Sequence, residues 1–524
     1  MKVEQKKPIS ILNDVLGPVM HGPSSSHTAG SFHIGRMTRA LLADEPASVT
    51  FTFDPDGSLA QVYQQQGSDL GFAAGIMGWP ITDERFYRAL ELAAEQDVHV
   101  AFRVEALAEA NHPNTVGICA TSRGGQNLHA VAKSIGGGAI VFTRIDVWPV
   151  NLTGDAHEVL IELAKDELGT EQAIRQRLAR DVQPLALPTR QARGALALLH
   201  ARRSEPLAPD ARAEIQGLSG VERVWTAPPI FYVQRGTPIA SSAAEMVELA
   251  ESRALSLGQV ALAYEANLLG ISENEVIDEV IRRFEIMQAA VHRGLEREPP
   301  TMQHLQPSAG RVYRAEAQGR VAIGGIHTRA AARAMAVMHV NGGMGVVCAA
   351  PTAGSAGVIP GVMVTLVEEK GLGHRQTALG LLAAAAVGLV VGTRATFAAE
   401  VAGCQVEIGA AGGMAAAGVV EIAGGTARQA SEAAAIALQN TMGLICDMVQ
   451  GVVEIPCHTR NAVAAANAFI CADLILGGYV NPIPLDETVD AVYAVGRMLP
   501  RELKCTALGG LACTPSARAM GTKA

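Results

Sequence analysis

The sequence contains few aromatic and few charged residues. Phe, Trp and Tyr together make up 4% of the 524 residues, and Asp, Glu, Lys and Arg make up 18%. Glycine is abundant, with 54 copies, and apolar residues account for 49%. Because large rings are scarce and small residues are common, the composition favours closely packed helices over a large sheet filled with aromatic side chains. The length allows roughly two to four domains.

The sequence also lacks basic clusters, an export signal and a long apolar run. No stretch rich in Lys and Arg occurs and the formal net charge is −9, so binding to nucleic acid or to anionic membranes is not expected. Residues 1–17 contain lysines but no apolar core before a cleavage site, which argues against a signal peptide. The longest apolar run, residues 378–392, is shorter than the roughly 20 residues that span a bilayer. We therefore expect a cytoplasmic protein in which this run forms a buried helix.

Residues 1–146 combine helical and strand patterns. Residues 47–53 alternate in polarity and are rich in β-branched side chains, and residues 98–107 show a similar pattern, so both predict strands. Residues 136–150 form a Gly-rich turn followed by a further strand pattern. An α+β domain is therefore expected over residues 1–146.

Residues 147–230 alternate between short strand and helix patterns. The expected elements are, in order, strand 157–164, helix 169–179, strands 182–188 and 192–201, helix 208–218 and strand 221–227. This βαββαβ order is that of a ferredoxin-like unit. Units of this kind often bind regulatory ligands or mediate dimerisation, an analogy that rests on the fold alone.

Beyond residue 230 the sequence becomes helical. The spacing of apolar residues predicts helices at 241–255, 273–296, 327–340, 376–391, 410–424, 426–443 and 460–477. Alanine is frequent in most of these segments, and such small side chains let helices approach closely. Residues 231–524 are therefore expected to form an all-α domain.

Most of the cysteines lie in this helical half. Seven of the eight follow residue 340, and Cys404, Cys446 and Cys457 each lie beside a Gly, Asp or Pro that ends or interrupts a helix. Three thiolates brought together from such positions suit a soft metal or an iron–sulfur cluster. The spacing is not that of a Cys-x-x-Cys motif, and the alternative is that these are small buried side chains among alanines.

A polar stretch near the N-terminus carries the second motif. Residues 22–30, GPSSSHTAG, precede a helical pattern and on their own are typical of a helix N-cap, with His27 as a capping or surface residue. Six further segments accompany it: HPNTV (112–116), SIGGG (134–138), AAPTAGSAGVIPGV (349–362), GCQVEIGAAGGMAAAG (403–418), ICDMVQGVVEIPCHTRNA (445–462) and TALGGLACTP (506–515). With these segments in this order, the chain resembles the iron–sulfur-dependent L-serine dehydratases (L-serine ammonia-lyases) over nearly its whole length.

The resemblance implies three domains on one chain. These are a β-type substrate-binding domain (1–146), an ACT-type regulatory module (147–230) and a catalytic α domain (231–524). The family's Arg-Pro-Gly effector loop is represented only by KDELGT (165–170), so effector binding by that loop is not implied. A homodimer or larger homo-oligomer is implied, and pyruvate as product would link the protein to amino-acid degradation and gluconeogenesis.

The resemblance also implies a [4Fe-4S] cluster, and no PLP, as the cofactor. Cys404, Cys446 and Cys457 correspond to the three cluster ligands, and Cys513 or Cys505 is a candidate fourth ligand that caps the open iron until substrate displaces it. The iron without a cysteine ligand would act as a Lewis acid toward the hydroxyl of L-serine. The amino acid would be converted to pyruvate and ammonia.

Further residues are implied to serve the substrate. Those expected to bind it are Ser24, Ser26, Thr28, Gln66, Ser68, Asp69, Asn114, Arg460 and Asn461, and those expected to act in catalysis are Ser25, His27 and His112. His112, beside Pro113, could equally be a turn residue. Arg460 and Asn461 could cap the helix that follows them.

One segment departs from the family pattern. Where the family has Gly-His-Gly-Thr-Asp, with its His as a candidate base, this chain has QQQGSD (64–69) with Gln66 at the His position. Glutamine accepts no proton at neutral pH, so either His27 or His112 is the base or the substrate differs. L-threonine and L-cysteine are the alternative substrates. A non-catalytic regulatory paralogue that keeps the cluster is the alternative function.

Lys133, followed by SIGGG (134–138), raises a rival enzyme class. Pyridoxal-phosphate enzymes also dehydrate serine, and a Gly-rich loop can bind phosphate through its backbone N–H groups. Such an enzyme needs its lysine and its phosphate loop on separate elements of a larger α/β domain. The helical second half of the chain does not fit that requirement.

Overall fold

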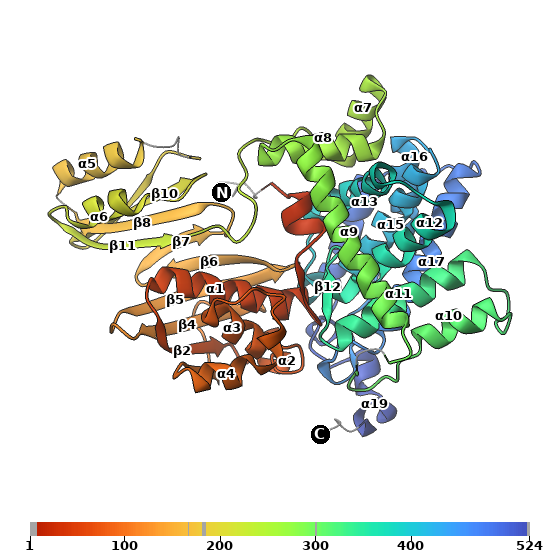
Figure 1. Ribbon diagram of the computed structural model, residues 1–524, viewed down its shortest axis with the longest axis horizontal. Coiled ribbons are helices and arrows are strands. Elements are labelled where there is room, and N and C mark those ends of the chain that lie inside the picture. Colours follow the sequence, from red (N-terminus) through yellow and green to blue (C-terminus); the bar gives the residue numbers. More distant parts are fainter. Residues whose placement is uncertain (1–7, 166, 181–184, 299–300, 521–524) are drawn as a thin grey trace.

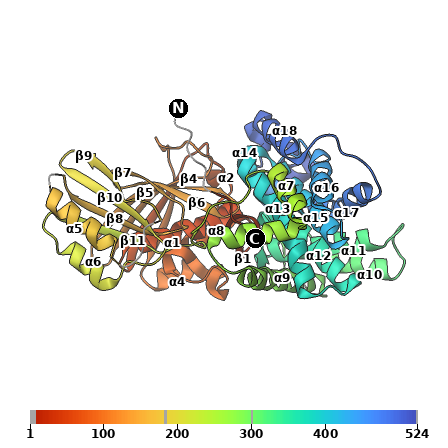
Figure 2. The same ribbon diagram turned by 90° about the horizontal axis from the view of Figure 1, so that it is seen from above.

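The computed structural model describes residues 8–165, 167–180, 185–298 and 301–520. Two parts that contain β-sheets lie on one side of the molecule, and a large helical body lies on the other (Figures 1 and 2). The prediction of a mixed first part and a helical second part is therefore confirmed.

The first part is built on a six-stranded sheet. Its strands are β2 (Pro46–Phe53), β3 (His99–Val104), β4 (Thr115–Ser122), β5 (Asn127–Gly136), β6 (Ala139–Ile145) and β7 (Trp148–Leu152), in the spatial order β3-β2-β4-β5-β6-β7. β2 and β3 pair in parallel, and the other neighbours are antiparallel. The strands predicted at 47–53 and 98–107 are confirmed as β2 and β3. Residues 136–150 hold two strands, and the second of them extends the sheet beyond residue 146.

Four helices accompany this sheet: α1 (Gly30–Leu42), α2 (Ser58–Val62), α3 (Ser68–Met77) and α4 (Ala89–Glu95). The longest two, α1 and α3, pack on each other and on one face of the sheet. Phe51 of β2 stacks on Phe72 of α3 with ring centroids 4.2 Å apart. The alternating pattern of β2 thus provides the apolar face on which the helices rest.

The second part has the predicted order of strands and helices. Its elements are β8 (His157–Ala164), α5 (Leu168–Leu178), β9 (Thr189–Arg193), β10 (Leu196–Arg203), α6 (Pro209–Gln216) and β11 (Val221–Ala227). The sheet is antiparallel throughout, in the order β11-β8-β10-β9. One face packs against α5 and α6, and the other buries Trp225 together with Trp148 of the first sheet.

The strand predicted at 182–188 is wrong in position. Residues 182–184 lie outside the described residues, residues 185–188 form no strand, and the strand at this point is β9, Thr189–Arg193. Pro188 immediately precedes it. Because proline has no N–H to donate to a neighbouring strand, the ladder begins only after it.

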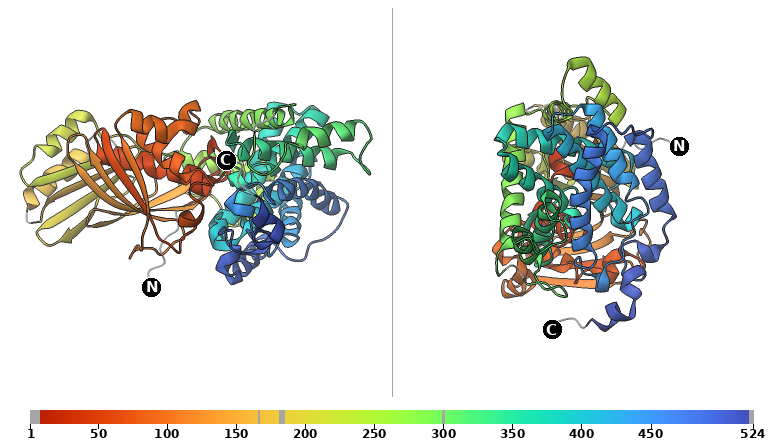
Figure 3. Two further views of the ribbon diagram at one scale, coloured as in Figure 1. Left: turned by 90° about the horizontal axis from the view of Figure 1, so that it is seen from below. Right: turned by 90° about the vertical axis from the view of Figure 1, so that its right-hand side faces the viewer.

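The helical body contains α7 (Ala243–Arg253), α8 (Leu257–Leu269), α9 (Glu273–Leu295), α10 (Ala309–Ala317), α11 (Ile326–Gly342), α12 (Val358–Lys370), α13 (His374–Arg394), α14 (Ala399–Ala402), α15 (Ile408–Ile422), α16 (Ala427–Gln439), α17 (Cys457–Leu476), α18 (Leu485–Met498) and α19 (Pro515–Ala519). Seven of these were predicted: α7, α9, α11, α13, α15, α16 and α17. α13 and α15 pack closely at the centre of the helical body (Figure 1), which faces the viewer in the right-hand view of Figure 3. A Cβ on Gly418 would lie 3.0 Å from the carbonyl oxygen of Gly380, so a larger residue here would require the two helices to shift by a few tenths of an ångström.

α13 is long and apolar enough to cross a membrane. However, 78% of its most apolar 18-residue window is buried inside the structure. This burial is typical of a core helix, as predicted for residues 378–392.

The helical part is not entirely α, and it also takes in the beginning of the chain. The short strand β12 (Val346–Cys348) pairs with β1 (Val19–His21), which corrects the all-α prediction. Glu265 of α8 is buried and accepts hydrogen bonds from the backbone N–H groups of Ile11 and Leu12 at 2.8 and 2.9 Å. Residues 8–21 are thus anchored in the helical body, and they lead directly into the Ser/His motif at the boundary between the two halves.

Candidate active site

The Ser/His motif forms a buried loop at this boundary. Ser24 caps the short helical turn η2 (Ser25–Ala29) by accepting a hydrogen bond from the backbone N–H of His27 at 3.2 Å. Asn341 of α11 donates from Nδ2 to the carbonyl oxygen of Pro23 at 2.9 Å. A Cβ on Gly22 would lie 2.1 Å from the carbonyl oxygen of Asn341, so only glycine allows this contact. The N-cap interpretation is therefore correct, but the loop is packed against the helical body rather than exposed.

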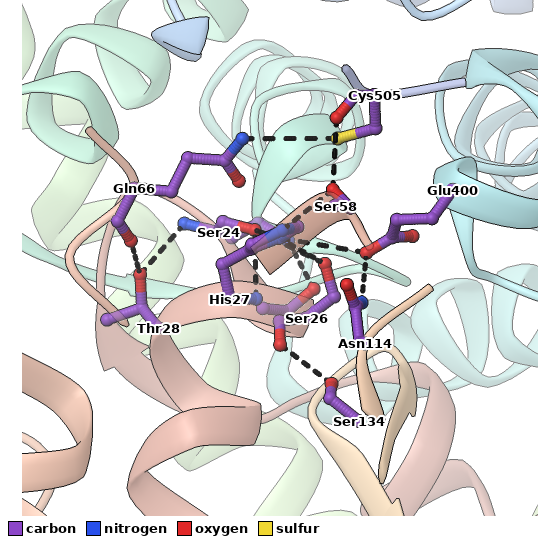
Figure 4. Close-up of polar contacts among 12 residues, drawn as sticks. Ser24, Ser26, His27, Thr28, Ser58, Gln66, Asn114, Ser134, Glu400 and Cys505 are labelled. Atoms are coloured by element: carbon purple, nitrogen blue, oxygen red, sulfur yellow. Dashed lines mark hydrogen bonds and ion pairs between the residues drawn. The ribbon is translucent and has the colours of Figure 1, made fainter. Parts of the chain in front are cut away.

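His27 is completely buried in this loop (Figure 4). Its Nδ1 lies 3.0 Å from Ser26 Oγ and 3.3 Å from Ser24 Oγ, and its Nε2 lies 3.1 Å from Ser58 Oγ of α2. Burial lowers the pKa of His27, and the Glu400 carboxylate partly offsets this effect. The imidazole is therefore neutral at neutral pH, which a general base requires.

The carboxylate beside His27 comes from the helical body. Glu400 of α14 is buried, and its Oε1 lies 3.7 Å from Nδ1 of His27. The same oxygen accepts a hydrogen bond from Asn114 Nδ2 at 2.8 Å. Burial raises the pKa of Glu400, but His27, Ser26 and Asn114 outweigh burial and hold the pKa below its ordinary value. The sequence analysis missed Glu400, although a carboxylate four residues before Cys404 was an available signal.

Asn114 and His112 lie at the turn before β4. Asn114 Oδ1 is buried and has no hydrogen-bond partner within the described ranges. His112 Nδ1 accepts a hydrogen bond from the Asn114 backbone N–H at 3.2 Å, and the His112 carbonyl accepts one from Thr115 N at 3.1 Å. His112 therefore stabilises this turn. Burial lowers the pKa of His112, and the nearby Glu400 opposes this effect.

Four thiols line one cavity at the end of this loop. They belong to Cys404, Cys446, Cys457 and Cys505, and all four are buried and free. Burial, followed by the nearby Cys404 thiol, raises the pKa of Cys457 well above its usual value. Ser24, Ser26, Gln66 and Arg460 line the same cavity. The structure thus brings together the Ser/His loop and the three cysteines that the sequence analysis singled out.

The two candidate fourth cysteines have different surroundings. The backbone N–H of Cys505 donates to the Cys446 carbonyl at 3.3 Å, and that of Cys446 donates to the Leu503 carbonyl at 2.9 Å. Cys505 has a φ of 62°, a left-handed conformation that is uncommon for a residue with a side chain. Cys513 is partly exposed, donates to the Leu508 carbonyl at 3.1 Å and does not line the cavity. Only Cys505 is therefore placed beside the other three thiols.

The donor set fits an iron–sulfur cluster. Within the described ranges, no group of three or more His, Cys, Asp or Glu side chains is close enough to hold a single metal ion. Four soft donors around one buried cavity, without a disulfide among them, are the kind of ligand that an iron–sulfur cluster takes.

The segment around Gln66 reaches the same cavity. Gln66 Nε2 lies 3.3 Å from both Met448 Sδ and the Gly451 carbonyl oxygen, and the Gln66 carbonyl accepts a hydrogen bond from Thr28 Oγ1 at 2.7 Å. Ser68 and Asp69, at the start of α3, do not line the cavity. Burial raises the pKa of Asp69 to about 6. Of this segment, only Gln66 is in position to contact a ligand in the cavity.

The remaining predicted residues mostly hold loops in place. Ser25 Oγ accepts a hydrogen bond from Ala353 N at 3.3 Å. Asn461 accepts one from Gly357 N at 3.0 Å and donates to the Gly354 and Cys457 carbonyls, each at 2.9 Å. Both side chains thus bind the loop that precedes α12.

Arg460 differs because it lines the cavity. Its guanidinium lies 2.9 Å from Asp447 Oδ1 and donates to the Ile445 carbonyl at 3.0 Å. Burial acts to lower the pKa of Arg460, but Cys404, Asp447 and Cys457 outweigh burial and raise it.

Comparison with known proteins identifies the family. The family model described as the serine dehydratase alpha chain matches residues 237–512. The chain belongs to this family. A probable L-serine dehydratase alpha chain of Bacillus subtilis is 38% identical over 279 residues, which are 53% of this chain and 93% of that protein. The L-serine dehydratase alpha chain of Peptoniphilus asaccharolyticus is 36% identical over 273 residues, 52% of this chain and 94% of its own.

The family is also represented by a second kind of chain. A probable L-serine dehydratase beta chain of Bacillus subtilis is 36% identical over 167 residues, 32% of this chain and 74% of its own. Similarity to both an alpha and a beta chain fits a single-chain member of the family, as the sequence motifs predicted.

Proposed function

We propose that this protein is an L-serine dehydratase, which converts L-serine to pyruvate and ammonia without PLP. The observation that carries this assignment is the single cavity lined by the Ser24 and Ser26 hydroxyls and by four cysteine thiols. Family membership supports the same activity. The expected test is anaerobic turnover of L-serine, L-threonine and L-cysteine, with L-serine as the preferred substrate. Turnover of L-threonine or L-cysteine alone would show that this amino acid, and not L-serine, is the substrate. No turnover of any of the three would favour the non-catalytic regulatory paralogue.

We propose Cys404, Cys446 and Cys457 as the ligands of a [4Fe-4S] cluster, with Cys505 rather than Cys513 as the fourth. When bound, the cluster would supply a Lewis acid for the hydroxyl group that leaves the substrate. Arg460 would balance the negative charge of the thiolates. Its ion pair with Asp447, which lies beside Cys446, keeps the guanidinium at the cavity wall.

The chain's own residues would bind the ends of the amino acid. The Ser24 and Ser26 hydroxyls line the cavity, and one of them can donate to the substrate carboxylate while the other donates to His27 Nδ1. Asn114 does not line the cavity, but its Oδ1 is a buried acceptor without a partner within the described ranges, and we propose the substrate ammonium as that partner. Thr28 acts indirectly, because its hydroxyl is occupied by the Gln66 carbonyl.

His27 is the proposed base. Its Nδ1 is within hydrogen-bond distance of the Ser24 and Ser26 hydroxyls, which line the cavity. A proton removed from the substrate can therefore reach Nδ1 through one of these hydroxyls. The Cα–H bond of the substrate breaks, the hydroxyl oxygen takes that proton, and the hydroxyl's own proton passes to Nδ1. His112 remains the second candidate, but its Nδ1 already accepts a backbone hydrogen bond.

The proposed domains follow the sheets. The substrate-binding domain extends to about residue 152, because β7 completes its sheet. Residues 157–227 form a ferredoxin-like module of ACT type, supported by its antiparallel β11-β8-β10-β9 order. The helical domain carries the cluster. A cytoplasmic homo-oligomer that acts on a small amino acid and binds neither membranes nor nucleic acid completes the proposal.

Changing Gln66 to His is expected to alter L-serine turnover less than about tenfold, because His27 supplies the base. Adding a missing general base would instead raise kcat by about 100-fold or more. Anaerobic steady-state assays with L-serine distinguish the two results. Gln65→His, at an exposed neighbouring position, is the matched control. A gain of the larger size in Gln66→His alone would show that position 66 is where the base belongs.

Changing Cys505 to Ala is expected to leave the cluster in place but to make it more sensitive to oxygen, because one iron loses its cysteine ligand. Cys513→Ala is the control and should resemble the parent, since Cys513 does not line the cavity. The measurement is the rate at which the visible absorbance of the cluster bleaches in air. Equal rates in all three proteins, or a change in Cys513→Ala alone, would exclude Cys505 as the fourth ligand.

A further inference from the structure

We propose that Glu400 is a positioning residue for proton transfer: it holds a carboxylate beside Nδ1, the proton-accepting atom of His27, and balances the positive charge that His27 gains. This inference rests on the proposed function, because it concerns the same active site. It assigns a role to a residue of the helical domain in a step otherwise performed by the N-terminal loop.

The location of Glu400 supports this role. α14 ends two residues before Cys404, and its Glu400 side chain points across the boundary toward the Ser/His loop (Figure 4). Only 4% of Glu400 is exposed, and none of His27 is. A buried carboxylate is costly unless it is paired or hydrogen-bonded. The hydrogen bond from Asn114 Nδ2, at 2.8 Å, meets this need and fixes the carboxylate with its Oε1 3.7 Å from His27 Nδ1.

The hydrogen bonds of Ser58 determine which nitrogen of His27 carries the proton. Ser58 has one hydroxyl proton, and its Oγ donates to the Cys505 carbonyl oxygen at 3.0 Å. A carbonyl oxygen can only accept, so Ser58 must accept the hydrogen bond from His27 Nε2 at 3.1 Å. Nε2 is therefore protonated in the neutral imidazole. Nδ1, the atom nearest Glu400, has the free lone pair.

Nδ1 is also the nitrogen that faces the cavity. Ser24 Oγ and Ser26 Oγ lie 3.3 and 3.0 Å from it, and both residues line the cavity. Proton uptake at Nδ1 leaves a positive charge on a side chain without solvent contact. Glu400 then becomes the counter-ion of the imidazolium at short range, where the low dielectric makes the attraction strong.

Other titratable groups face this pair from the neighbouring elements. Burial lowers the pKa of His112, at the turn before β4. The charge of Glu400 opposes this effect, and that of Lys133 of β5 adds to it. Glu407, at the start of α15, lies on the cavity wall. Burial raises its pKa, and the nearby Glu400 raises it further. Neither Lys133 nor Glu407 is in hydrogen-bond contact with His27. Of these charged groups, Glu400 is therefore the one that lies beside the imidazole.

Glu400→Gln tests the proposal because it keeps the shape of the side chain and an acceptor for Asn114 while it removes the charge. We expect kcat to fall by about 100-fold, within the range of general-base effects, with KM changed less than about threefold. Glu400 raises the pKa of His27, so its loss should move the ascending limb of the kcat–pH profile to lower pH. Glu400→Asp, which keeps the charge, should recover part of kcat.

Two measurements separate this role from a purely structural one. Iron content should be the same in both variants and the parent. Hydrogen–deuterium exchange at imidazole C2, followed by mass spectrometry, gives the pKa of His27 directly and should show it lowered in Glu400→Gln. Glu265→Gln, a buried carboxylate far from the cavity lining, is the control and should leave the His27 value unchanged.

Unchanged kcat and an unchanged pKa of His27 in Glu400→Gln would overturn the proposal. If that variant does not fold, the exchange measurement is made on Glu400→Asp, whose carboxylate is one methylene shorter. A pKa of His27 equal to that of the parent would then contradict the pairing. If the parent protein does not convert L-serine, the proposed function fails. The His27 measurement would still decide the role of Glu400.

Discussion

Replacing Cys457 with Ser is expected to abolish L-serine turnover and to remove most of the bound iron. Cys457 begins α17 and lines the cavity with three other thiols, and a serine hydroxyl is a much poorer ligand for iron than a thiolate. Loss of one of the four proposed cluster ligands leaves the cluster incompletely held. Anaerobic purification, followed by iron and sulfide analysis and a pyruvate assay, measures both effects.

Cys471→Ser is the matched control for this prediction. Cys471 is a free, fully buried cysteine of the same helix, but it does not line the cavity. Its replacement should lower the thermal stability somewhat and leave iron content and turnover close to those of the parent. Equal iron loss in both variants would indicate a general folding effect, and full iron in Cys457→Ser would exclude Cys457 as a ligand.

Replacing His27 with Gln is expected to lower kcat for L-serine by about a thousandfold, within the range attributed to a general base. Glutamine can still donate to Ser58 Oγ, which lies 3.1 Å from His27 Nε2, but it cannot take up a proton. Iron content should therefore remain that of the parent. Steady-state kinetics and iron analysis on the same preparation test this directly.

His33→Gln is the control for the His27 variant. His33 is a buried histidine of α1, and its ring Nδ1 lies 2.8 Å from the Gly138 carbonyl oxygen, away from the cavity. Its turnover should stay within about twofold of the parent. A His27→Gln protein that keeps more than about a tenth of the parental kcat would contradict His27 as the base and favour His112.

Periodic patterns predicted the main elements of the fold, because burial of one face imposes a fixed spacing on the sequence. The helices α9 and α17 and the strands β2 and β11 lie where this spacing placed them. The strand β9 was misplaced because most of its residues are exposed, so that no apolar alternation marks it. The pairing of β1 with β12 joins residues more than 300 positions apart, and no local pattern reveals such a contact.

The candidate site was predictable only in part for a similar reason. The three cysteines and the Ser/His loop stand in recognisable motifs, and the structure brings them to one cavity. The choice of Cys505 over Cys513 depends on the backbone path after α18, which the sequence does not show. Glu400 was missed because its proposed role depends on contacts with residues 27 and 114 on another part of the chain.

The central claim is that the thiol-lined cavity and the Ser/His loop form one active site. Mössbauer spectra of anaerobic, 57Fe-labelled protein, recorded with and without L-serine, test it most directly. The expected spectrum is that of a four-iron cluster in which L-serine changes the signal of one iron and leaves the others unaltered. A protein without iron, or an iron–sulfur spectrum that L-serine does not change at saturating concentration, would contradict it.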